Sequence, residues 1–344
     1  MHAVCSTPHN LITDTTLSDD QETDPWIQIP RVLSRWPWPR TINPFYEEAK
    51  AEADASIRSF KVFTPAAQAA FDRCDFARLA SLGYPKLNRD GIRIACDLMN
   101  LFFVFDEKSD SSTSQETRYL VDCIMDAIRN PEKSRREGEW IGGAIAQQFW
   151  QNVIRTATPS AQRRFVDRVR TIAEYFPIRR QTIGLLPSLP INEIHLGIPD
   201  YAMEHPTVRA LEDLAVDMVA IGNDLFSWNR EGEEAHNLVT VVMKELAVPV
   251  QEAFDWIGRY HEGLVDRFLS LYRNSVPVFG HEKVNAELRE YLDGVGNWVR
   301  CNESWSFESK RYFGKDGEKI MKTRFFKLLP RVGVDYSQVF VPSL

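Results

Sequence analysis

Helical periodicity along almost the whole chain is the feature that most restricts its fold. Beyond Pro44 the apolar residues recur at helical spacing, alternating strand patterns are scarce and no segment repeats. No change in composition marks a second domain, and 44% apolar residues in 344 can build a large core. We therefore predict an all-α fold with a single domain at residues 26–344 and a polar, disordered tail at 1–25. Helices are expected at about 64–83, 88–108, 114–129, 139–156, 159–175, 206–230, 248–275 and 283–301.

Two stretches interrupt the helical pattern. Residues 26–44 contain four prolines among apolar side chains, which predicts an extended segment laid over the helical body. Residues 177–199 are rich in proline and glycine. They form either a plain loop between helices or a broken helix whose backbone amides and carbonyls point into a cavity. Arg179 and Arg180 lie just before Gly184, and they favour a functional role for this segment over a plain loop.

Charge and cysteine content exclude several kinds of partner. The net charge of −7 argues against nucleic acid, which is bound by basic faces, but it allows a phosphorylated small molecule. The five cysteines show no C-x-x-C spacing, which is typical of reduced thiols in a cytoplasmic protein. We find no secretory signal and no apolar run near the ~20 residues that span a bilayer, so no membrane span is expected.

Residues 223–231 place oxygen donors one helical turn apart. Asn223, Ser227 and Glu231 are spaced i, i+4 and i+8, so they share one face of a helix that is largely apolar upstream. Asparagine and serine are indifferent helix formers, and their alignment on one face therefore indicates a purpose beyond surface polarity. Oxygen donors without sulfur or imidazole suit Mg²⁺ far better than zinc. The stretch predicts half of a magnesium site.

A second acidic stretch follows an apolar helix. Asp106 and Asp110 share a face, with Glu107 between them. Carboxylates at a helix C-terminus oppose the helix dipole, so a solvated helix end is a weaker explanation than a bound cation. An EF-hand is a poor alternative, because Lys108 occupies a ligand position and Ser111 the required glycine. We predict that the two stretches hold metal between facing helices.

Several arginines and aromatic residues gain meaning beside these metal motifs. Arg180, Arg230 and the Arg311-Tyr312 pair are candidate donors to a phosphate group, since the planar guanidinium suits bidentate phosphate contacts. Taken singly, each arginine is more often a surface ion-pair partner. The aromatic rings of Phe102, Phe103 and Trp305 could stabilise a cation, although core packing explains any single ring.

In the order and the sequence of these motifs the chain resembles the class I terpene cyclases, and within them the fungal, basidiomycete-type sesquiterpene synthases. Asp106-Glu-x-x-Asp110 matches the aspartate-rich motif, with Glu107 where many relatives carry aspartate. Asn223-Asp-Leu-x-Ser227-x-x-x-Glu231 matches the second metal motif, with Arg230 in place of a frequent lysine. Arg180 with Gly184 matches the diphosphate-sensing arginine and effector glycine, and Arg311-Tyr312 the C-terminal pair. The resemblance covers about residues 26–320.

The resemblance implies a helical bundle around a central apolar cavity, and cyclisation of farnesyl diphosphate with release of diphosphate. Three Mg²⁺ ions are implied, two at Asp106 with Asp110 and one at Asn223, Ser227 and Glu231. Arg180, Arg230, Arg311 and Tyr312 would bind the diphosphate, while Phe103 and Trp305 would line the cavity. The carbonyl of Gly184 is expected to face the same cavity. A homodimer is left open.

Product and reaction class remain to be chosen among alternatives. The sequence around Cys96–Asp110 resembles that of enzymes that close a ring between carbons 1 and 11 of the farnesyl chain, giving humulyl-derived products such as protoilludene. A prenyl chain-elongating synthase on the same fold would ordinarily carry two Asp-Asp-x-x-Asp motifs, and here the second site is of the asparagine-serine-glutamate type. A non-catalytic helical scaffold would leave the co-occurrence of three motifs unexplained.

Overall fold

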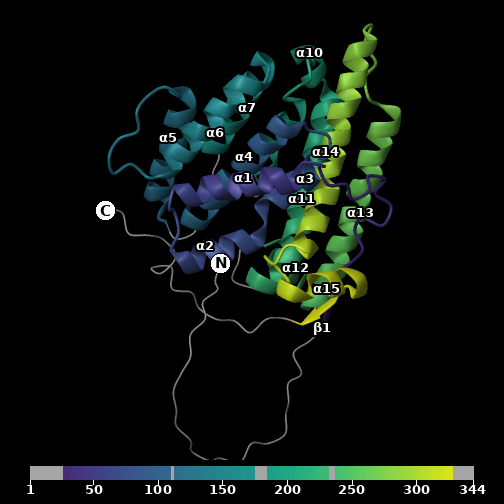
Figure 1. Ribbon diagram of the computed structural model, residues 1–344. Coiled ribbons are helices and arrows are strands. Elements are labelled where there is room, and N and C mark those ends of the chain that lie inside the picture. Colours follow the sequence, from purple (N-terminus) through teal and green to yellow (C-terminus); the bar gives the residue numbers. More distant parts are fainter. Residues whose placement is uncertain (1–25, 110–111, 175–183, 232–236, 328–344) are drawn as a thin grey trace, which may run out of the picture.

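The structure, a computed structural model, describes residues 26–109, 112–174, 184–231 and 237–327. It is a bundle of helices with one two-stranded ribbon, which confirms the all-α prediction (Figure 1). The predicted tail at 1–25 lies outside the described residues. Among the helices described, none combines the length and apolarity that crossing a membrane requires.

The first half of the bundle runs to the end of α7. Its helices are α1 (Tyr46–Ser59), α2 (Pro65–Cys74), α3 (Phe76–Gly83), α4 (Arg89–Ser109), α5 (Ser114–Arg129), α6 (Gly142–Thr156) and α7 (Pro159–Glu174). Local chemistry sets several ends: the Thr64 hydroxyl accepts from Ala67 N with Pro65 in the first turn, as the sequence predicted. Thr113 and Glu116 form a reciprocal capping box that starts α5.

One predicted helix is in fact two. The sequence predicted a continuous helix at 64–83, but the chain breaks between α2 and α3 at Asp75, whose φ is +51°. Aspartate tolerates this left-handed conformation, and its carboxylate then accepts from Arg78 N and caps α3. The prediction was wrong because the apolar periodicity continues across the break, so nothing in the pattern marks it.

The second half begins with short turns and ends with long helices. Its short elements are α9 (Leu185–Ser188), the 3₁₀ turn η1 (Leu189–Glu193) and α10 (Asp200–Met203). The longer helices are α11 (Pro206–Glu231), α12 (Leu238–Leu246), α13 (Val250–Asn274) and α14 (Glu282–Glu308). The 3₁₀ turn η2 (Gly314–Asp316), α15 (Gly317–Thr323) and β2 (Phe325–Lys327) follow.

The long helix α14 occupies a central place. It packs against α3 and α11, while α4 packs against α1, α3 and α6. Figure 1 shows α13 on one flank of the bundle and α5 on the other, with α14 between them. From Asn297 to Phe307 nearly every side chain of α14 is buried, so its C-terminal end is enclosed by the other helices. The Arg311-Tyr312 pair follows shortly after this end of α14.

The proline-rich segment lies over the helical body as predicted, but residues 32–35 form a turn and not extended chain. It opens with β1 (Trp26–Gln28), which pairs antiparallel with β2. Trp36 then buries its ring and donates Nε1–H to Gly296 O at 2.9 Å. Arg300 on α14 donates to the carbonyls of Leu33 and Trp38. These contacts satisfy backbone groups that proline-rich chain cannot pair with itself.

Candidate active site

The first acidic motif lies at the C-terminal end of α4. Asp106 and Glu107 stand in its last turn, with side chains 41% and 23% exposed respectively. Asp110 lies outside the described residues. The end of this apolar helix therefore presents carboxylate oxygens at a half-open position.

The second motif lies on the last two turns of α11. Asn223 is half-buried and Ser227 fully buried, and both lie on one face as their spacing predicts. Glu231 is the last residue of α11, and its side chain lies outside the described part. Asp224, the neighbour of Asn223, points elsewhere: it is 3% exposed and its Oδ2 accepts from Leu238 N at 2.7 Å.

The Arg311-Tyr312 pair joins the two motifs. Arg311 reaches α4, with Nη2 3.3 Å from Asp106 Oδ2 and Nη1 3.5 Å from Glu107 Oε1. Tyr312 reaches α11, where its hydroxyl accepts from Asn223 Nδ2 at 2.9 Å. Two adjacent residues thus contact stretches of the chain that lie more than a hundred positions apart.

Arg230 belongs to the same group. It lies half-buried at the end of α11, and its Nη1 donates to the backbone carbonyl of Arg311 at 3.5 Å. Two predicted diphosphate-binding arginines therefore lie side by side. Arg180, the third, lies outside the described residues.

Arg311 is a buried cation held by its neighbours. Burial alone would lower its pKa, but attraction to Tyr312, Asp106 and Glu107 outweighs that and raises the pKa above its ordinary value. Its Nε–H is buried without a hydrogen-bond partner among the described residues. A fixed guanidinium with an unused donor is suited to an anionic ligand.

Aromatic rings surround the Arg311 guanidinium. Its carbon lies 4.9 Å from the Phe103 ring centre and 5.7 Å from that of Phe76. Phe103 stacks on Phe76 at 3.7 Å, and Trp305 lies 5.9 Å from both rings. Trp305 is itself held by hydrogen bonds from Nε1 to the carbonyls of Cys74 and Asp75. The structure thus groups Phe103 and Trp305 beside the charged site.

Phe76 is a member of this aromatic group that the sequence analysis missed. It opens α3 directly after the break at Asp75. No spacing relates it to Phe103, and only the packing of α3 on α4 brings the two rings together.

Gly184 adopts the conformation that its residue type allows. Its φ is +72°, in the left-handed region, and it opens α9. The Phe102 ring lies 3.6 Å from where a Cβ would stand. The Gly184 carbonyl accepts from Ser188 Oγ at 2.7 Å, so one of its lone pairs points along α9. Orientation of the other toward a cavity stays a prediction.

The donor chemistry of the site fits a hard divalent cation. Asp106, Glu107, Asn223 and Ser227 offer oxygen, which Mg²⁺ prefers. Because Asn223 Nδ2 donates to Tyr312, the oxygen on the other branch of the Asn223 amide is not the atom that contacts Tyr312. Within the described ranges no three histidine, cysteine, aspartate or glutamate side chains form a metal-binding group. The predicted set includes Asp110 and the Glu231 side chain, both outside that description.

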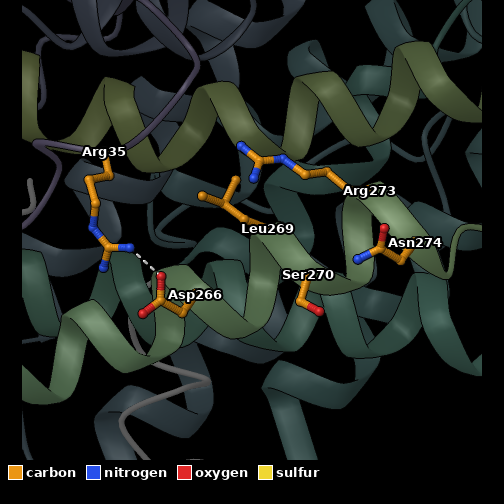
Figure 2. A pocket seen from close by; sticks show the side chains of 6 residues that line it. All are labelled: Arg35, Asp266, Leu269, Ser270, Arg273 and Asn274. Carbon is orange, nitrogen blue, oxygen red and sulfur yellow. Dashed lines mark hydrogen bonds and ion pairs between the residues drawn. The ribbon is translucent and has the colours of Figure 1, made fainter.

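A separate groove lies on the flank of the bundle. It measures about 340 Å³ and is lined by Arg35 and by five residues of α13: Asp266, Leu269, Ser270, Arg273 and Asn274. Figure 2 shows Arg35 in an ion pair with Asp266 across it. None of the predicted site residues lines this groove, and the central apolar cavity stays a prediction.

Comparison with known proteins agrees with this site. The family model described as "Terpene synthase family 2, C-terminal metal binding" matches residues 97–170 and 166–267, which include both motifs. A Delta(6)-protoilludene synthase of Stereum hirsutum is 44% identical over 326 residues, covering 88% of each chain. One of Armillaria gallica is 43% identical over 89% of this chain and 94% of its own. Sesquiterpene synthase 9 of Postia placenta is 44% identical over 89% of this chain and 95% of its own.

A solved structure shares the fold. The crystal structure of a-eudesmol synthase superposes with a TM-score of 0.70 at 20% identity, over 79% of this chain and 98% of that one. The chain therefore belongs to the terpene synthase family. Within that family it is a sesquiterpene synthase, a lyase that uses a divalent metal and acts on a small prenyl substrate. The resemblance inferred from the motifs is confirmed.

Proposed function

We propose that the protein ionises and cyclises farnesyl diphosphate to a sesquiterpene hydrocarbon and releases diphosphate. The observation that carries the proposal is the Arg311-Tyr312 pair, which contacts Asp106 on α4 and Asn223 on α11 at once. The comparisons favour cyclisation over chain elongation, because the matched relatives are called protoilludene and sesquiterpene synthases. We take residues 26–344 to act as one domain in this reaction.

In this proposal the polar site takes the leaving group. The allylic C1–O bond breaks, and its electron pair leaves with the diphosphate oxygen. Arg311 and Arg230 supply positive charge there, and Tyr312 supplies a hydroxyl donor. Both stabilise the negative charge that develops on the diphosphate. Asp106 and Asp110, with Asn223, Ser227 and Glu231, would hold three Mg²⁺ ions. When bound, these ions neutralise the departing diphosphate.

The aromatic group takes the organic cation. Phe103, Phe76 and Trp305 are buried or half-buried and carry no ionisable group, so they can face a carbocation without trapping it. Exclusion of water keeps the cation from ending as an alcohol. For the product we propose closure between carbons 1 and 11 and formation of Delta(6)-protoilludene, which is supported by the names of the matched relatives.

The test is a reaction with Mg²⁺ and farnesyl diphosphate in the absence of isopentenyl diphosphate, with volatiles identified by gas chromatography–mass spectrometry. Asp106→Asn and Asn223→Ala should each lower turnover by about a hundredfold or more, since each removes an oxygen from the cation site. Asp213→Asn is the matched control, since Asp213 carries an exposed carboxylate on α11, the helix of Asn223. Wild-type rates in either site variant would refute the metal assignment.

A further inference from the structure

Asn237 ties the second metal motif to the helix that follows it. This residue precedes α12 and is 1% exposed. Its Nδ2 donates to the backbone carbonyl of Asp224 at 2.9 Å and lies 3.3 Å from Ser227 Oγ. Its Oδ1 accepts from Val239 N at 2.9 Å. One buried amide therefore contacts the turn of α11 that carries Ser227 and caps α12.

Capping alone does not explain asparagine at this position. Serine or aspartate would cap α12 equally well, because the cap needs only an oxygen acceptor. The Asp224 carboxylate already accepts from Leu238 N in the same first turn. What asparagine adds is the amide donor, and this donor is directed at α11.

The contact constrains the Ser227 hydroxyl. A hydroxyl has one proton and two lone pairs, and the Asn237 donor engages one lone pair. The Ser227 proton is therefore turned away from Asn237, and the second lone pair points in a different direction from the first. Ser227 is fully buried, so its hydroxyl cannot reorient through bulk water.

We propose that Asn237 is a positioning residue that orients the Ser227 oxygen toward the divalent cation. The inference rests on the proposed function, because it takes Ser227 as a metal ligand. Groups that hydrogen-bond a metal ligand commonly change metal affinity ten- to a hundredfold when they are removed. The Asn237 amide is such a group for the second motif.

The test uses two variants that keep a capping oxygen. Asn237→Ser removes the amide donor, and Asn237→Asp keeps the side-chain shape but replaces the donor with an oxygen. The full-length protein is titrated with Mg²⁺ at fixed inorganic diphosphate, and binding is followed by calorimetry and by the shift in melting temperature. Both variants should need about tenfold more Mg²⁺ for half-saturation. Wild-type half-saturation in both would overturn the proposal.

Thr64→Ala is the matched control for the loss of a cap. Thr64 caps α2, so its removal should lower the melting temperature and leave the Mg²⁺ half-saturation unchanged. A merely structural Asn237 would behave in the same way, and that result for the Asn237 variants would count against positioning.

Ser227→Ala separates the two proposals. If Asn237 acts through Ser227, Asn237→Ser should have no further effect on Mg²⁺ half-saturation in the Ser227→Ala background. If Ser227→Ala raises the half-saturation concentration but Asn237→Ser does not, the positioning role alone is wrong. If Ser227→Ala itself has no effect, both the ligand assignment and the positioning role are wrong.

Discussion

Removing the Tyr312 hydroxyl should weaken metal binding by an amount that the structure limits. In Tyr312→Phe the ring remains in place, edge-on to Trp305 at 5.7 Å and 5.9 Å from the Arg311 guanidinium carbon. The substitution removes the oxygen that accepts a hydrogen bond from Asn223 Nδ2 at 2.9 Å. It therefore tests the hydrogen bond that orients the Asn223 amide and leaves the aromatic packing intact.

The expected magnitude follows from the chemistry of that bond. A hydrogen bond between neutral groups contributes about 0.5–1.5 kcal/mol net. This corresponds to a roughly two- to tenfold change in a binding constant. We expect the Mg²⁺ half-saturation concentration to rise by such a factor, because the amide oxygen of Asn223 is then held less strictly toward the cation.

The assay is the Mg²⁺ titration at fixed inorganic diphosphate, with kcat/KM for farnesyl diphosphate measured alongside. Tyr260→Phe is the control, since this tyrosine is half-exposed on α13 and stacks on Trp256. In an Asn223→Ala background the effect of Tyr312→Phe on Mg²⁺ half-saturation should shrink, and what remains is the contribution of the Tyr312 hydroxyl as a donor to the diphosphate. An unchanged half-saturation concentration would refute the orienting role. A rise in the half-saturation concentration above a hundredfold would refute it too, because one neutral hydrogen bond cannot account for so large an effect.

Two further substitutions test burial and backbone strain. Burial lowers the pKa of His261 to about 4 from about 6.5 in the unfolded chain, so its contribution to stability is complete above pH 6.5 and declines as the pH falls toward 4. Between pH 7.5 and pH 5, the free energy of unfolding measured in urea should fall by about 2 kcal/mol less in His261→Gln than in wild type. Equal falls in the two proteins would contradict this assignment. Gly184→Ala should lower stability by about 1–2 kcal/mol through its φ of +72°, because the neighbouring Phe102 leaves ordinary space. Gly263→Ala, at a helical position with open space, should be neutral or stabilising, and a wild-type melting temperature for Gly184→Ala would refute the strain.

The candidate site was predictable where its geometry is local. Asn223 and Ser227 lie on one face of α11 because a helix repeats every 3.6 residues, and any helix over these positions aligns them. The same holds for the position of Asp106 at the end of an apolar helix. By contrast, the break at Asp75 depends on one residue adopting a left-handed conformation, which periodicity does not register.

Contacts across the bundle were not predictable in this way. Phe76 stacks on Phe103 because α3 packs on α4, and the sequence holds no spacing rule for that pair. Asn237 follows Ser227 by only ten residues, yet its amide reaches the hydroxyl because α12 turns back onto α11. A sequence pattern describes one element at a time, while these contacts depend on how two elements meet.

The order of residues alone determined that the chain is helical, which oxygens align along each helix and that their chemistry suits magnesium. These properties follow from the helical repeat and from the side chains themselves. Tertiary structure decided that Arg311 and Tyr312 bridge α4 and α11, that aromatic rings enclose the guanidinium and that Ser227 is buried against Asn237. The reason is that close packing brings together distant segments whose separation along the chain carries no record of their contact.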